Sequence, residues 1–417
     1  MISRTVFKKI AVLAMLLLCF QAAFAQAPKQ EKLLNGLKLL MWNDPSANQI
    51  SIKVRIHSGS AFDPQGREGL MAMMAQNFFP TDAARDYFKD DLGGFLTINS
   101  NYDYIQIDAS SKPEEFLTML EAVATAVSNP TIDKETTAKL KALQAAKIAE
   151  WEKNSSYLAD RAVASRLFGT FPYGRPELGT AGSIAEIEYA DLLDAKKRFI
   201  TADNATVTIR GKFDQALAFR AVRRYFGSWL KSDKLVPSTF KQPDDPDTKM
   251  ASITASSEGE TQVRYALRGL ARNDKDYAAS AVLTFVLEDR LKQNLAANAD
   301  KATVRHCAHI LPGNVVFAYS KPVDAEVIGN LPSLLLAKAI TNDEFAAAKT
   351  RIVAASKDIS VEDIWLNVDT FKLASAADEL KSLDAVQFAD VQRVAERLSK
   401  NPVVSLVLSK AEKTASN

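Results

Sequence analysis

Short stretches in which hydrophobic and polar residues alternate recur between longer amphipathic stretches. The most regular one consists of Ile52, Lys53, Val54, Arg55, Ile56 and His57. Its period of two predicts a half-buried strand. Residues 95–99 and 102–108 predict two more strands, and residues 113–128, 134–153 and 157–168 predict long helices. Strands that adjoin in sequence, with helices grouped between them, favour an α+β sandwich whose helices cover one sheet face.

The second half of the chain repeats the order of the first. Residues 128–135 lead into an alanine- and lysine-rich helix, and residues 339–345 do the same. Both begin with capping residues followed by acids in the first turn. Each half closes with a helix and then a strand, at residues 206–211 and 403–409. Two matches in the same order predict a duplicated unit.

A linker separates the two units. Residues 231–249 are polar, contain three prolines and have no hydrophobic period, which is typical of a linker. We therefore predict an α+β fold with two homologous α/β sandwich domains, at residues 26–230 and 250–417. Each domain is expected to hold a mainly antiparallel twisted sheet with helices on one face.

The first 25 residues predict an export signal. A basic start precedes an apolar run at residues 10–20, and a small-x-small cleavage pattern ends at Ala25. The apolar run is short for a membrane span, and no later stretch is long enough for one. We expect a cleaved signal and a mature protein that is periplasmic or secreted, with no membrane span.

Composition excludes several classes of protein. Removal of the signal leaves 392 of the 417 residues, enough for two domains with separate cores. The formal charge of +2 becomes about −1, and no basic patch of the nucleic-acid type remains. The mature chain keeps one cysteine, Cys307, which rules out an internal disulfide. We expect no nucleic-acid partner.

Six segments of the first half stand in a fixed order: residues 34–38, 50–60, 66–80, 92–95, 171–180 and 190–211. They include Leu-Gly-Gly-Phe at residues 92–95 and Pro-Tyr-Gly-Arg at residues 172–175. In this order they resemble the pitrilysin/insulinase family of zinc metallopeptidases. The resemblance implies the family's duplicated fold and, for members that keep the inverted zinc motif His-x-x-Glu-His, zinc metalloendopeptidase activity. In that family the motif lies on the helix that residues 66–80 match.

Laid on that motif, this chain has Ala72, Ala75 and Gln76 at the three positions. Residues i, i+3 and i+4 share one helix face, so two imidazoles could bind a zinc ion while a carboxylate works on its bound water. Two methyl groups and a carboxamide cannot do either task. The family's third ligand, a glutamate, falls near Lys147, whose charge opposes a cation. The resemblance thus implies a degenerate site without metal or other cofactor, with zinc only in a catalytic partner.

Substrate binding gives two further sets of positions. The family's second half supplies an Arg and a Tyr, seven residues apart, that hold the substrate, and counting places them at Ala296 and Thr303. Both substrate-holding side chains are then lost. In the family an extended peptide adds to the sheet edge beside the active helix. The resemblance implies that edge here at residues 92–99, with Gly93, Gly94 and Phe95 as peptide-binding candidates.

The few histidines offer little alternative chemistry. In the strand that residues 304–311 suggest, His306 faces one side while Cys307 and His309 face the other. Two ligands on one face do not close a zinc site. His57, at a strand end, is expected at the surface or in a turn.

Three functions fit the sequence. The first is an exported, non-catalytic family member that serves as a partner subunit or peptide-binding scaffold for a related zinc peptidase. The second is an active metalloendopeptidase with a non-standard metal site, and the third is a purely structural assembly module. The first predicts no stoichiometric zinc in the purified protein, whereas the second predicts about one ion for each chain.

Overall fold

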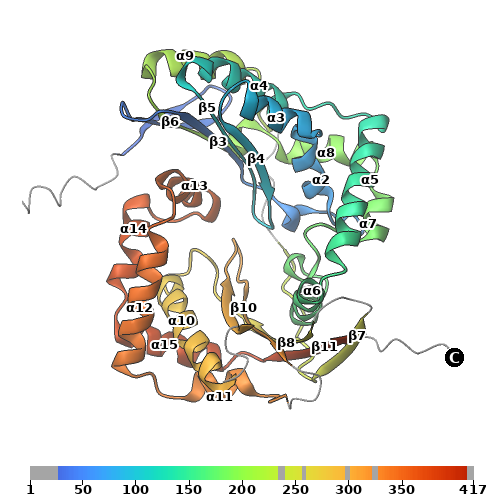
Figure 1. Ribbon diagram of the computed structural model, residues 1–417, viewed down its shortest axis with the longest axis vertical. Coiled ribbons are helices and arrows are strands. Elements are labelled where there is room, and N and C mark those ends of the chain that lie inside the picture. Colours follow the sequence, from blue (N-terminus) through green and yellow to red (C-terminus); the bar gives the residue numbers. More distant parts are fainter. Residues whose placement is uncertain (1–26, 233–239, 256–259, 296–300, 322–326, 411–417) are drawn as a thin grey trace, which may run out of the picture.

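The computed structural model describes residues 27–232, 240–255, 260–295, 301–321 and 327–410, which form two stacked halves (Figure 1). The predicted signal at residues 1–25, part of the predicted linker and Ala296 lie outside the described residues.

The first half has a six-stranded sheet in the order β1-β2-β6-β3-β5-β4. The β2–β6 pair is parallel and the other pairs are antiparallel. The strands are β1 (Lys29–Lys32), β2 (Lys38–Asn43), β3 (Ile50–Ile56), β4 (Phe95–Ser100), β5 (Ile105–Ser111) and β6 (Ala205–Gly211). The α-helices are α2 (Leu70–Phe78), α3 (Asp82–Asp90), α4 (Phe116–Ser128), α5 (Lys134–Trp151), α6 (Ser155–Phe168), α7 (Ala181–Glu186), α8 (Tyr189–Phe199) and α9 (Gln215–Phe226).

The second half has a five-stranded sheet in the order β7-β11-β8-β10-β9, with β7 and β11 parallel. The strands are β7 (Ala251–Ala255), β8 (Thr261–Arg268), β9 (Thr303–Cys307), β10 (Asn314–Lys321) and β11 (Val404–Lys410). The helices are α10 (Tyr277–Leu295), α11 (Leu331–Ala337), α12 (Asn342–Ser356), α13 (Val361–Phe371), α14 (Ala376–Ala385) and α15 (Phe388–Ser399). This strand order matches β2-β6-β3-β5-β4 strand for strand. The predicted fold class, α+β with two sheets that each carry helices, is confirmed.

Each sheet buries one face against helices of its own half. In the first half Ile52, Val54 and Ile56 join a core formed with α2, α4, α8 and α9. In the second half Val263 and Tyr265 of β8 join a core formed with α10, α12 and α15. The period of two then leaves the intervening residues of each strand on the opposite face.

The opposite face of each sheet is covered by a helix from the other half, which the sequence did not predict. Helix α6 of the first half lies on β8 and β11 of the second sheet (Figure 1). This contact is mainly apolar. The buried residues of this cluster in α6, β8, β10 and β11 are Ala159, Val163, Leu167, Phe168, Ala266, Val316, Ala318, Val404, Leu406 and Leu408.

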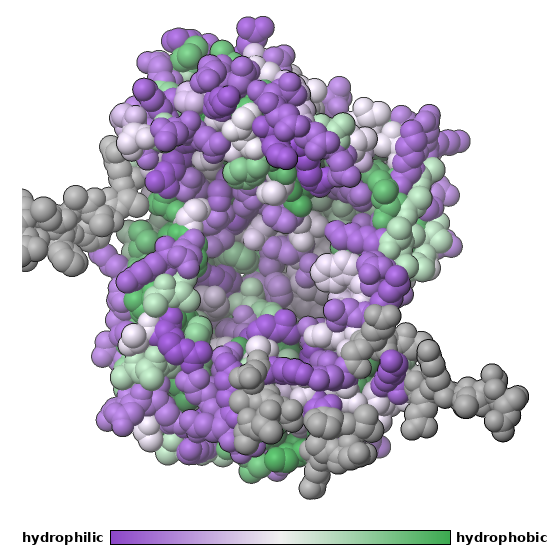
Figure 2. Space-filling model, viewed as in Figure 1, coloured by the Kyte–Doolittle hydropathy of each residue, from purple (hydrophilic) through white to green (hydrophobic). Residues whose placement is uncertain are grey.

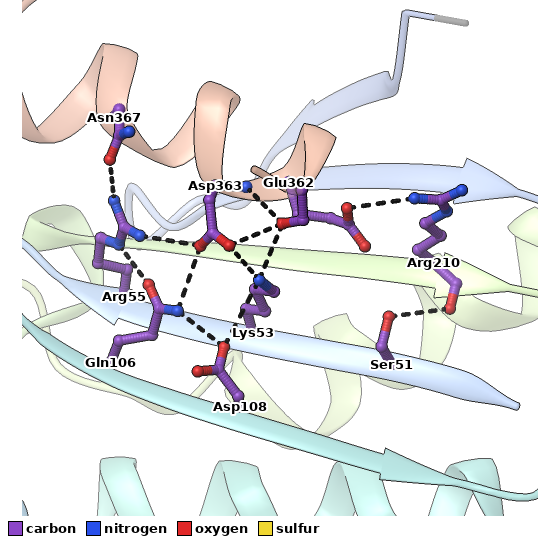
Figure 3. A network of polar contacts seen from close by, with 10 residues as sticks. Ser51, Lys53, Arg55, Gln106, Asp108, Arg210, Glu362, Asp363 and Asn367 are labelled. Carbon is purple, nitrogen blue, oxygen red and sulfur yellow. Dashed lines mark hydrogen bonds and ion pairs between the residues drawn. The ribbon is translucent and has the colours of Figure 1, made fainter. Parts of the chain in front are cut away.

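Helix α13 of the second half lies on the first sheet, and here the contact is largely ionic (Figure 3), with one edge-to-face ring pair, Trp42 and Trp365, at a centroid distance of 6.3 Å. Asp363 accepts hydrogen bonds from Lys53 and from Arg55, the latter at 3.0 Å. The guanidinium of Arg55 also donates to Asn367 at 2.7 Å and to Gln106 of β5 at 2.6 Å. Two further ion pairs flank this group: Lys38 with Asp369 at 2.9 Å and Arg210 with Glu362 at 3.4 Å. The two inter-half contacts are therefore related in position and different in chemistry.

His57 lies inside this ionic contact, so its predicted place at the surface or in a turn is wrong. Its two ring nitrogens lie 3.0 Å from the hydroxyl groups of Thr370 on α13 and Thr206 on β6. Burial lowers the pKa of His57 to about 3, which favours the neutral ring. The sequence placed the residue at a strand end but gave no sign of the helix that covers it.

Candidate functional site

A cavity of about 860 Å³ lies between the two halves. Figure 2 shows the surface hollowed between them. The first half contributes lining residues from α2, β4, α5 and α6, and the second half contributes residues from β7, β9, β10 and β11.

Helix α2 forms one wall of the cavity. Asp63 holds the first turn of this helix in place. The Asp63 carboxyl accepts the backbone N–H groups of Gly69 at 2.7 Å and Met71 at 2.8 Å. Burial raises the pKa of Asp63 to about 7. Gly69 has φ +93°, and a Cβ there would meet the carbonyl oxygen of Leu178 at 2.5 Å, so the helix start requires glycine.

Helix α2 packs one side against the first core and lines the cavity with the other. Leu70, Met74 and Phe78 are buried in the first core. Ala72, Ala75 and Gln76 line the cavity, as the helical period requires for positions i, i+3 and i+4.

Helix α5 brings Lys147 to the same cavity. Its start is capped by Asp133, which accepts the N–H of Thr136 at 2.7 Å. One turn before Lys147, the Gln144 amide donates to the carbonyl of Leu178 at 2.9 Å and fixes the helix against the segment that follows α6. Within the described residues no carboxylate lies within 4.0 Å of the Lys147 ammonium group. All four positions that the sequence matched to zinc-site residues therefore meet in one cavity.

The sheet edge next to the cavity is β4, the terminal strand of the first sheet. Its last residues, Ile98, Asn99 and Ser100, line the cavity. The candidates Gly93, Gly94 and Phe95 lie at the other end of the strand, outside the cavity lining. A Cβ on Gly94 would meet the Ser110 carbonyl oxygen at 1.9 Å, so this glycine allows β4 to approach β5. The sequence found the strand but named the end that is further from the cavity.

The second half contributes Cys307 and His309 to the lining, while His306 points to the other side. The His306 ring accepts the backbone N–H of Leu270 at 3.1 Å, and burial lowers its pKa to about 4. His309 Nδ1 lies 2.7 Å from the Asp103 carboxylate, and its ring packs on Tyr173 at a centroid distance of 4.4 Å. Thr303 begins β9 and is not among the residues that line the cavity.

The donor set around the cavity does not fit a metal centre. In the parts of the chain that the structure describes, no three His, Cys, Asp or Glu side chains stand close enough together to hold one ion. Burial raises the pKa of the Cys307 thiol, which favours the neutral form over the metal-binding thiolate. The α2 face has neither an imidazole nor a carboxylate to activate a water molecule. What the cavity offers is a row of strand-edge backbone groups with polar and aromatic walls.

The helices of the described residues are all too short or too polar to cross a membrane.

Two family descriptions match adjacent parts of the chain. Residues 38–181 match "Insulinase (Peptidase family M16)", and residues 186–302 match "Peptidase M16 inactive domain". A curated relative, an uncharacterized zinc protease of Rickettsia bellii, is 24% identical over 208 residues. The matched region is 49% of this chain, and it spans 50% of the length of that relative.

Solved structures share the fold across most of the chain at low sequence identity. A protease from Helicobacter pylori superposes with a TM-score of 0.81 at 17% identity, covering 92% of this chain and 100% of that chain. A peptidase M16 inactive domain from Pseudomonas fluorescens gives 0.78 at 18% identity, covering 92% and 98%. A chain of Complex III2 from Candida albicans gives 0.74 at 16% identity, covering 93% and 97%. The chain belongs to the insulinase family of peptidases, family M16.

Proposed function

We propose that this protein is an exported, non-catalytic member of family M16 that works as a partner subunit or peptide-binding scaffold for a related zinc peptidase. The observation that carries the proposal is the meeting of Ala72, Ala75, Gln76 and Lys147 in one cavity. These residues occupy the positions that the resemblance assigns to the zinc ligands and the general base.

The physical argument concerns proton transfer and charge. Peptide hydrolysis by a zinc site needs a metal-bound water and a base that removes its proton. Two methyl groups, an amide and an ammonium group supply neither metal ligands of useful strength nor a base. The positive charge of Lys147 also raises the electrostatic energy of any divalent cation nearby.

Peptide binding needs less than hydrolysis does. An extended peptide that pairs with the edge of β4 uses backbone N–H and C=O groups. Ile98, Asn99 and Ser100 of this strand line the cavity, and a volume of about 860 Å³ lies within the usual range of ligand sites. The fold also occurs in a chain of Complex III2, which supports a role within an assembly.

The second candidate function is an active metalloendopeptidase with a non-standard metal site. The observation in its favour is that the Rickettsia bellii relative carries the description zinc protease. The third candidate function is a purely structural assembly module, for which the cavity would bind no ligand.

Metal analysis separates the first two candidates. We expect the purified mature protein to contain far less than one zinc ion for each chain and to leave unfolded peptide substrates intact. The matched control is the quadruple variant Ala72→His, Ala75→Glu, Gln76→His, Lys147→Glu, which should gain zinc. Stoichiometric zinc and chelator-sensitive cleavage by the unmodified protein would overturn the proposal.

Co-purification from the native host tests the partner role. A related zinc peptidase that elutes with the protein supports it. A strictly monomeric protein, with no related peptidase eluting alongside it and no peptide bound, would leave the partner role without support.

A further inference from the structure

Glu177 lines the cavity, and among the described residues its carboxyl group forms no ion pair. Glu177 is half-buried and belongs to the cavity lining. Its backbone is held on both sides, since the Tyr102 hydroxyl donates to the Arg175 carbonyl at 2.7 Å and the Gln144 amide donates to the Leu178 carbonyl at 2.9 Å. The side chain is thus presented to the cavity by a fixed segment. Among the described residues no hydrogen bond or ion pair is made to its carboxyl group.

The cations around Glu177 are already engaged. Their partners are as follows: Arg161 binds Glu152 at 2.8 Å, Arg305 binds Asp160 at 2.8 Å, Arg175 donates to the Asp63 carbonyl at 2.9 Å, and His309 contacts Asp103 at 2.7 Å. Arg175, the nearest cation in sequence, also lines the cavity, but its guanidinium donates to the backbone carbonyls of Asp63 and Ala61. Lys147 also lines the cavity without a carboxylate partner among the described residues, but it is not among the charges that act on Glu177, so a ligand can supply the missing charge partner.

The surroundings of this carboxyl group suit an organic cation. Tyr157 and Tyr173 line the cavity with Glu177, and Tyr102 packs on Tyr173 at a centroid distance of 5.3 Å. Aromatic faces attract ammonium and guanidinium groups. Burial raises the pKa of Glu177 to about 7, and the attraction of His309 offsets this only in part, because the ionised carboxyl group loses hydration here. A bound cation would compensate for that loss.

From this arrangement we infer that Glu177 receives an ammonium or guanidinium group of the bound peptide, so that the cavity selects peptides with a basic side chain. The inference rests on the proposed function as a peptide binder and names the class of peptide. A hydrogen-bonded pair of opposite charges at a site shielded from water is worth more than the same pair on a surface. Lys147 lines the same cavity and carries the opposite charge, so it disfavours a second basic side chain near α2.

The test compares peptides that differ by one functional group. The first peptide is extended, labelled with fluorescein and blocked at both ends, and it carries arginine at one position. The second peptide has citrulline at that position, which keeps the shape of the side chain and removes its charge. A third peptide carries citrulline with a free amino terminus. Binding of each to the full mature protein is measured by fluorescence anisotropy. The variant is Glu177→Gln, and the control is Glu121→Gln, which neutralises an exposed carboxylate on α4 outside the cavity lining.

We expect the unmodified protein to bind the arginine peptide roughly 10- to 100-fold more tightly than the citrulline peptide. Glu177→Gln should reduce this ratio to about one, and Glu121→Gln should leave it unchanged. If the free amino terminus restores tight binding to the citrulline peptide, the cation is a terminal amine and the side-chain assignment is wrong.

The outcomes also separate this inference from the proposed function. Equal binding of the arginine and citrulline peptides overturns the selection of basic peptides and leaves peptide binding intact. Retention of the full ratio in Glu177→Gln overturns the role of Glu177. Failure to bind any of the peptides overturns both the inference and the peptide-binding function.

Discussion

Removal of the Asp363 charge should release α13 from the first sheet. Asp363 contacts both Lys53 and Arg55, and Arg55 is only 2% exposed. In Asp363→Asn the buried guanidinium keeps the side-chain oxygens of Gln106 and Asn367 and loses its carboxylate. Loss of one partner of a buried ion pair costs about 3–5 kcal/mol, whereas exposed pairs contribute about 0–1 kcal/mol. Because the Asp363 side chain is 26% exposed, we expect a cost of about 2–3 kcal/mol.

Amide hydrogen exchange measures this effect locally. If α13 detaches while both halves stay folded, amides in residues 361–371 should exchange roughly 30- to 150-fold faster in the variant. Amides of α6 should not change, because its contact with the second sheet is mainly apolar and an ion pair there, between Asp160 and Arg264, does not involve Asp363. Raising the salt concentration should also make the amides of α13 exchange faster in the unmodified protein, because salt screens the ion pairs.

A matched variant makes the prediction refutable. Asp194→Asn removes an ion pair to Arg198 at 3.2 Å on the surface of α8, where both side chains are about half exposed. This control should cost less than about 0.5 kcal/mol. If Asp363→Asn is no more costly than Asp194→Asn, or if α6 exchanges faster together with α13, the ionic contact is not what holds α13.

Three further predictions concern stability, each read from urea unfolding. Leu406→Ala, at a fully buried position under α6, should cost about 2–4 kcal/mol, and an exposed leucine such as Leu380 changed to Ala should cost far less. Because burial raises the pKa of Glu177 to about 7, the carboxyl favours folding when protonated, and this contribution is lost as the pH rises from about 4.5 through 7. Glu177→Gln should therefore be more stable than the unmodified protein at pH 8, on the order of 1–3 kcal/mol, and equal to it near pH 4; a difference independent of pH would contradict this. Hydrogen bonds from Arg290 lower the pKa of Glu344 to about 2, so this pair stabilises the fold above about pH 4.5, and its contribution is lost as the pH falls toward 2. Glu344→Gln should cost about 2–3 kcal/mol at pH 7 and progressively less below pH 4, and a constant cost would refute the ionic explanation.

Local patterns were enough to predict most of the elements. The alternation around Val54 predicted β3, and the helix predicted at residues 134–153 is α5 (Lys134–Trp151). A strand predicted to start at Tyr102 instead begins at Ile105, because the Asn101 side chain accepts the N–H groups of Asp103 and Tyr104 and forms a turn. Short-range periodicity therefore predicts the elements and misses turns that depend on a single side chain.

Contacts between distant segments were beyond the reach of the sequence. The alternation at residues 52–57 predicted that Lys53, Arg55 and His57 lie on the polar face of a half-buried strand, and nothing in the sequence connected them with the acids of α13. Each half of this ionic contact is locally indistinguishable from surface, since its partners lie some 300 residues apart. For the same reason Glu177 was not singled out: its charge is unusual only because segments from both halves enclose it. The resemblance to the pitrilysin/insulinase family did identify the positions of Ala72, Ala75, Gln76 and Lys147.

The exchange of α6 and α13 has a consequence for the order in which the chain is synthesised. The first sheet is complete once residue 211 has been made, but its covering helix appears only at residues 361–371. During that interval its open face presents Lys53, Arg55 and His57, which water can solvate, beside one large apolar side chain, Trp42. The second sheet presents an apolar face, and α6, its cover, has already been synthesised by the time β7 appears. The first sheet, which stays uncovered until α13 is synthesised, therefore has the charged contact. The second sheet, whose covering helix α6 already exists, has the apolar contact. This order limits aggregation of the growing chain.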